Sequence, residues 1–130
     1  YLLAFLTGFL IISFINENKI VSPYYAINLL WYPCLENLFS ILRKLSIGKD
    51  ISRPDNYHLH HLIYLFLERK KIKMLNNISG ILILLFNSIA LTLSTYFFYS
   101  TIKQLQILFV CILLYISFYF LLKKKLKIKF

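Results

Sequence analysis

The chain has 130 residues, of which 59% are apolar and 15% charged, and its formal net charge is +10. In a soluble domain about a quarter of the residues are charged, so this composition excludes an ordinary water-soluble enzyme. Residues 78–102 and 104–122 contain no charged side chain. Because about 20 apolar residues cross the hydrocarbon core of a bilayer, the sequence predicts an integral membrane protein.

Two further apolar segments precede these. Residues 1–16 are uncharged but short for a span, and residues 20–42 carry one charge, Glu36, and are interrupted by Pro23 and Pro33. We expect Pro33 to kink the second segment one turn before Glu36.

Glu36 is a candidate functional residue, because a carboxylate inside a membrane span is costly and is rarely retained without a role. The alternative interpretation is that it reaches the interface or pairs with Arg43 or Lys44, about two turns further along the chain.

The expected fold is all-α, a polytopic transmembrane protein with about four spans. Because the chain starts with Tyr inside an apolar segment, we expect it to be the C-terminal fragment of a larger helical bundle. The predicted organisation is two spans in residues 1–42 (the first truncated), a cytoplasmic substrate-binding loop in 43–77, two spans in 78–122 and a basic tail in 123–130.

The basic residues predict the orientation. Thirteen of the fifteen Lys and Arg lie in residues 43–73 or in the tail, whereas only Lys19 and Lys103 lie in the other two connections. By the positive-inside rule, the long loop and the C-terminus are cytoplasmic. Basic residues beside a membrane favour anionic lipid as the partner over nucleic acid.

The loop contains all three histidines, in the segment RPDNYHLHHLIY. Pro54 and Asp55 predict a helix start, with Asp55 as the cap and the helix continuing to about Lys73. On that helix His58 and His61 share a face, and His60 points elsewhere.

The start of such a helix attracts anions, and imidazole and guanidinium groups add donors suited to phosphate. The loop therefore predicts a phosphate or diphosphate site, whose candidate substrate-binding residues are His58, His60, His61, Arg43, Arg53 and Asp55.

Two other functions stay open. A small membrane protein could bind or transport a metal ion through the histidines, with Asp55 or Glu68 as a further ligand. Cys34 and Cys111 lie in apolar segments without metal-site spacing, and the last two spans contain no His, Asp or Glu, which counts against a transporter. The other alternative is a structural membrane subunit.

The segment PDNYHLHHLIY resembles the histidine motif of the polyprenyl-phosphate N-acetylhexosamine-1-phosphate transferases, a superfamily that includes phospho-MurNAc-pentapeptide translocase. The match reads Asp55, His58, Leu59, His60 and His61. The preceding segment, with Glu36, an Arg-rich turn and the pair Gly48–Lys49, is similar too. The resemblance covers roughly residues 1–68, and the last two spans match only in hydrophobicity.

The resemblance implies transfer of N-acetylhexosamine-1-phosphate, for which GlcNAc is the commonest sugar in the family, from a UDP-sugar to undecaprenyl phosphate. UMP is released, Mg²⁺ is required, and the product serves cell-wall or lipopolysaccharide synthesis at the bacterial inner membrane. His58, His60 and His61 would bind the nucleotide-sugar diphosphate, with Arg43 or Arg53 in contact with it. The sequence leaves open whether the protein forms a homodimer.

Two features depart from the family. Many members have Asp where this chain has Glu36, and the paired aspartates of the family have no counterpart in this sequence. We therefore expect no catalytic residue and no metal ligand in this fragment, which would be inactive by itself.

Overall fold

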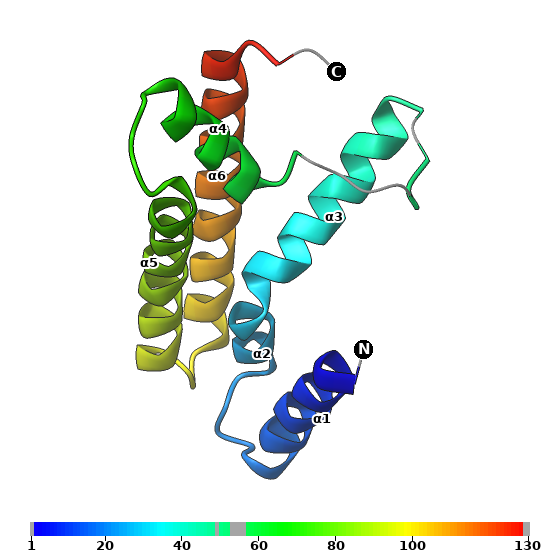
Figure 1. Ribbon diagram of the computed structural model, residues 1–130. Helices are drawn as coiled ribbons and strands as arrows, with labels where there is room; N and C mark the ends of the chain where they lie inside the picture. Colours follow the sequence, from blue (N-terminus) through cyan, green and yellow to red (C-terminus); the bar gives the residue numbers. More distant parts are fainter. Residues whose placement is uncertain (1, 49, 53–56, 129–130) are drawn as a thin grey trace.

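The computed structural model describes residues 2–48, 50–52 and 57–128, and within them it contains six α-helices and no strand (Figure 1). The helices are α1 (Leu2–Glu17), α2 (Pro23–Leu29), α3 (Trp31–Ser46), α4 (Leu59–Arg69), α5 (Leu75–Tyr96) and α6 (Thr101–Leu126). The expected all-α class is confirmed. By length and composition, α5 and α6 could cross a membrane, and α1 is apolar but shorter.

Residues 20–42 do not form one continuous helix. Leu30, at φ −110° and ψ 10°, ends α2 and precedes α3. Pro23 begins α2 and Pro33 lies in the first turn of α3, where the missing N–H removes no hydrogen bond. The predicted kink at Pro33 is therefore wrong, because the helix is already broken at Leu30.

The helix that carries the histidines is shorter than predicted. Tyr57 and His58 precede it in non-helical conformation, and α4 begins at Leu59 rather than at Asp55. At the other end, Lys71 has a φ of 55°, which stops the helix before Lys73. Asp55, the expected cap, lies outside the described residues.

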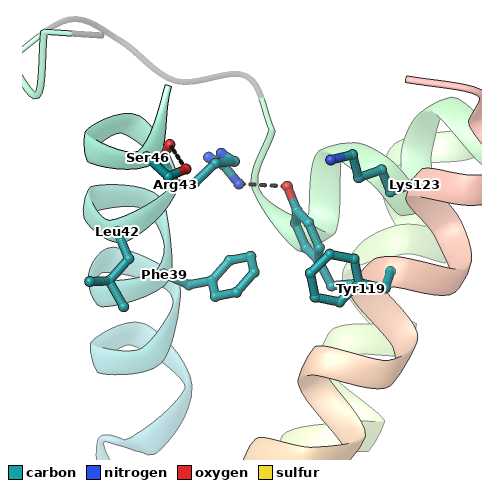
Figure 2. A pocket seen from close by; sticks show the side chains of 7 residues that line it. Phe39, Leu42, Arg43, Ser46, Tyr119 and Lys123 are labelled. Carbon is teal, nitrogen blue, oxygen red and sulfur yellow. Dashed lines mark hydrogen bonds between the residues drawn. The ribbon is translucent and has the colours of Figure 1, made fainter. Parts of the chain in front are cut away.

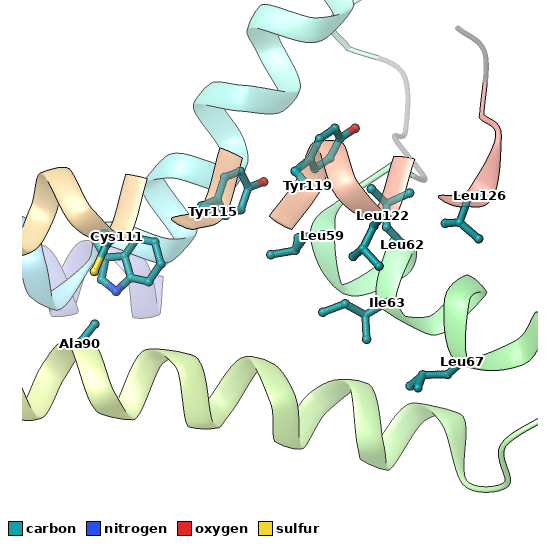
Figure 3. Close-up of a cluster of buried hydrophobic side chains, with 11 residues drawn as sticks. Leu59, Leu62, Ile63, Leu67, Ala90, Cys111, Tyr115, Tyr119, Leu122 and Leu126 are labelled. Atoms are coloured by element: carbon teal, nitrogen blue, oxygen red, sulfur yellow. The ribbon is translucent and has the colours of Figure 1, made fainter. Parts of the chain in front are cut away.

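A hydrophobic core joins α4 to the two long helices (Figure 3). Leu59, Leu62, Ile63 and Leu67 are buried at the spacing of one helical face. They pack in one cluster with α6 residues that follow the same period, namely Tyr115, Tyr119, Leu122 and Leu126. Burying each aliphatic side chain stabilises the fold by roughly 1.5–3 kcal/mol, so the core fixes α4 across α5 and α6.

A buried polar network joins α2 to the opposite end of the long helices. Asn28 Nδ2 donates to the Gln104 side-chain oxygen at 2.6 Å and to its backbone oxygen at 3.0 Å. Ser94 Oγ donates to the same side-chain oxygen at 2.6 Å, and Gln104 Nε2 donates back to the Ser94 carbonyl at 2.7 Å. Ser22 N also donates to the Phe98 carbonyl, so the α1–α2 connection lies beside the α5–α6 turn.

Candidate functional site

Glu36 connects α3 to the start of α4. It lies in the middle of α3, its residue exposure is 7%, and both of its carboxylate oxygens accept hydrogen bonds. Oε2 is 2.9 Å from His58 Nδ1, and Oε1 accepts from Leu59 N at 2.9 Å and from the Tyr32 hydroxyl at 2.9 Å. In the described part of the chain its ion pair is with His58, and not with Arg43 or Lys44 as the alternative interpretation expected.

The contact with Leu59 makes Glu36 a cap for α4. The first amides of a helix have no partner within the helix, and His58, which precedes α4, does not cap it with its own side chain. A carboxylate at this position satisfies an amide and also faces the positive end of the helix dipole. Glu36, which lies 23 positions before Leu59 in the sequence, therefore has the capping role that was expected of Asp55.

The same contact fixes the tautomer of His58. A carboxylate only accepts hydrogen bonds, so Nδ1 carries the proton and donates to Glu36. Nε2 of the neutral ring is then left with a lone pair, and in the protonated ring it becomes a second donor. Since 26% of the His58 side chain is exposed, the ring is half-buried and can meet a ligand.

The three imidazoles form a row. The His58 and His60 rings are stacked at 5.6 Å between centroids with an interplanar angle of 7°, and His60 and His61 are 5.0 Å apart. The expectation that His60 points away from the other two is wrong, because the helix begins only at Leu59. Partial desolvation and the neighbouring His61 lower the pKa of His60, which favours the neutral form of this ring.

Arg43 is buried one turn before the end of α3 and is bound to the residue that precedes His58. Its Nη1 donates to the Tyr57 carbonyl at 2.9 Å and to the Tyr119 hydroxyl at 2.6 Å, and its Nη2 donates to Ser40 Oγ at 3.4 Å. The guanidinium carbon also lies 5.7–5.8 Å from the centroids of the Tyr57 and Tyr119 rings. Arg43 therefore joins α3, α6 and the approach to the histidines.

A hollow of about 290 Å³ opens beside Arg43, between α3 and α6 (Figure 2). Arg43, Ser46 and Lys123 supply its polar groups, and the apolar part of its lining is formed by Phe39, Leu42, Tyr119 and Phe120. Phe39 packs edge-on against Tyr119 at 4.7 Å between centroids. The hollow thus combines cationic groups with an aromatic and aliphatic wall.

The metal implied by the resemblance does not fit these residues. Mg²⁺ requires several oxygen ligands in octahedral arrangement. Among the described site residues the only carboxylate is Glu36, and its oxygens already accept from His58, Leu59 and Tyr32. Within the described residues no three His, Cys, Asp or Glu side chains converge as metal ligands.

The structure therefore brings together five of the residues singled out from the sequence, namely Glu36, Arg43, His58, His60 and His61. Arg53 and Asp55 lie outside the described residues. Sequence reasoning missed Tyr32, Tyr57 and Tyr119. Tyr115 and Tyr119, four residues apart within an uncharged segment, were the available signal, because hydroxyl groups on one face of an apolar helix need polar partners.

Comparisons with known proteins identify no relative. No protein-family model matches the chain, and neither the curated proteins nor the solved structures contain a match.

Proposed function

We propose that this chain forms the histidine-bearing part of a membrane transferase that moves N-acetylhexosamine-1-phosphate from a UDP-sugar to undecaprenyl phosphate. The observation that carries the proposal is the bond of Glu36 to both His58 and Leu59 N, which holds the histidine motif in one arrangement beside Arg43. The resemblance of PDNYHLHHLIY to the family's motif supplies the identity of the substrates.

The histidines would bind the diphosphate of the nucleotide sugar. With Nδ1 bound to Glu36, Nε2 of His58 becomes a donor when the ring is protonated, and exposed His61 adds another imidazole on the same short segment. Arg43 holds Tyr57 and thereby the backbone before His58, so its first task is to position the motif. The family's catalytic carboxylates would come from outside this sequence.

The hollow between α3 and α6 suits the lipid substrate. A polyprenyl phosphate is an anionic group on a long apolar chain, and the hollow has Arg43 and Lys123 beside an apolar wall of Phe39, Leu42 and Phe120. In this proposal the chain is a bacterial inner-membrane protein with about four spans, α1 and the α2–α3 pair adding to α5 and α6. The long loop and the C-terminus face the cytoplasm.

The experiment is UMP release by the full-length protein in membranes supplied with UDP-GlcNAc, undecaprenyl phosphate and Mg²⁺. We expect His58→Ala and His61→Ala each to reduce release by about 100-fold or more, since each removes a diphosphate contact. Asn76→Ala, an exposed polar change in the first turn of α5, is the control and should keep wild-type turnover. Wild-type turnover of both histidine variants at equal membrane abundance would contradict the proposal.

A further inference from the structure

Basic side chains from two distant parts of the sequence meet at one end of the molecule. One set ends α4 and continues into the connection to α5, and the other ends α6 (Figure 1). Arg69 Nη1 lies 3.5 Å from the Lys125 carbonyl, 56 residues further along the chain, and donates to it. We call this set the basic patch; its members are Arg69, Lys70, Lys71, Lys73, Lys124, Lys125 and Lys127.

Within the described residues, the members of the basic patch make no ion pair with a carboxylate. Lys70 Nζ and Lys125 Nζ lie over the same ring, Phe66, at 5.9 and 5.4 Å from its centroid. Both contacts are with a neutral aromatic ring, which leaves the charge of each ammonium group in place. The two helix C-termini offer only about half a negative charge each. Within the described residues, neighbouring Glu68 makes no ion pair with the patch.

Apolar side chains lie next to these charges. In the connection between α4 and α5, Ile72 and Met74 alternate with Lys71 and Lys73, and their exposed fractions are 40% and 69%. Such a mixture is typical of chain at a bilayer surface, where basic groups contact headgroups and apolar groups enter the acyl region. The patch also lies at the ends of the two helices that are long enough to cross a membrane.

We propose that the basic patch binds the phosphate groups of anionic phospholipids, with Ile72 and Met74 inserted among their chains. Both basic segments would contact the same few headgroups, so that lipid binding would hold the end of α4 against the end of α6. This site is separate from the histidine site and does not depend on the transferase proposal.

The experiment is native mass spectrometry of the purified protein in detergent, titrated with phosphatidylglycerol or phosphatidylcholine. The patch variant is Lys70→Gln with Lys125→Gln. The control is Lys19→Gln with Lys103→Gln, which removes the same charge at the other end. Lys103 is a close match, because its Nζ also lies over an aromatic ring, that of Phe97 at 5.9 Å.

We expect the wild-type protein to prefer phosphatidylglycerol, and the patch variant to bind it about 10- to 30-fold more weakly, since each basic residue near a lipid surface adds a few-fold. The control should keep wild-type affinity. A second variant, Lys71→Gln with Lys73→Gln, also removes two positive charges from the patch, and neither side chain contacts a ring in the described structure. If the first variant unfolds, this second variant still measures the effect of the charge on lipid binding.

Equal affinity for both lipids, or equal losses in the patch variant and the control, would overturn the proposal. Displacement of phosphatidylglycerol by millimolar inorganic phosphate would assign the patch to a soluble phosphate and would overturn the lipid assignment.

Discussion

A single carboxylate, that of Glu36, accepts three hydrogen bonds, and two of them, from His58 and Leu59, connect α3 to the histidine segment. Replacing it by Glu36→Ala leaves the Leu59 amide, the Tyr32 hydroxyl and the His58 ring without this partner. Unpaired buried polar groups each cost about 1–3 kcal/mol, so we expect a loss of about 2–3 kcal/mol in the free energy of unfolding. Denaturant titration in detergent measures this loss, and hydrogen exchange at the Leu59 amide should accelerate.

Glu17→Ala is the control for this change, because Glu17 is an exposed acidic residue at the end of α1. It should change the free energy of unfolding by less than about 0.5 kcal/mol. If both variants unfolded at the same denaturant concentration, Glu36 would not be the cap of α4.

The residues of the site were predictable one by one, but their pairing was not. Glu36 is conspicuous as the only charge in residues 20–42, and the histidines by their clustering. The bond between Glu36 and His58 spans 22 residues, and no local pattern encodes a contact at that separation. The predicted direction of the His60 side chain was also wrong, because it depended on the residue at which α4 begins. At that residue, Leu59, the helix is capped by a tertiary contact with Glu36.

At the scale of elements, the length and apolarity of the uncharged segments correctly predicted the two long helices. The uncharged segments 78–102 and 104–122 contain most of α5 and α6. The break at Leu30 was missed, because both prolines lie at helix starts, where they are compatible with the helix. What holds α2 in place is the buried amide network of Asn28 and Gln104, which hydropathy does not reveal.

Gln104→Leu tests this network. The change removes the side-chain oxygen that accepts from Asn28 and Ser94, and it leaves the carbonyls of Ser94 and Phe97 without the Gln104 donor. Interhelical hydrogen bonds in membranes contribute about 0.6 kcal/mol each, so we expect a loss of about 2 kcal/mol in the free energy of unfolding. Gln106→Leu, an exposed position on the same helix, is the matched control. A loss no larger than that of the control would contradict the role of the network.

At the scale of the whole molecule, the contacts define two ends. Ser22 bonds to Phe98 and Thr101 at one end, and at the other Arg69 bonds to Lys125. The ends differ sharply in charge, because ten of the twelve basic residues that the structure describes belong to the segments around the second end. Translocation of Lys and Arg is disfavoured, so we expect the end that contains Arg69 and Lys125 to remain in the cytoplasm.

Cysteine labelling tests this orientation in a background of Cys34→Ser and Cys111→Ala, which removes both native thiols. Asn76→Cys places a thiol near the basic end, and Tyr99→Cys places one in the α5–α6 turn; both positions are exposed. A membrane-impermeant maleimide added to intact cells should label the Tyr99→Cys protein, and should label the Asn76→Cys protein only after the membrane is opened. The reverse labelling pattern would mean the opposite orientation in the membrane. The histidine segment would then lie outside the cell, where a UDP-sugar made in the cytoplasm would not reach it.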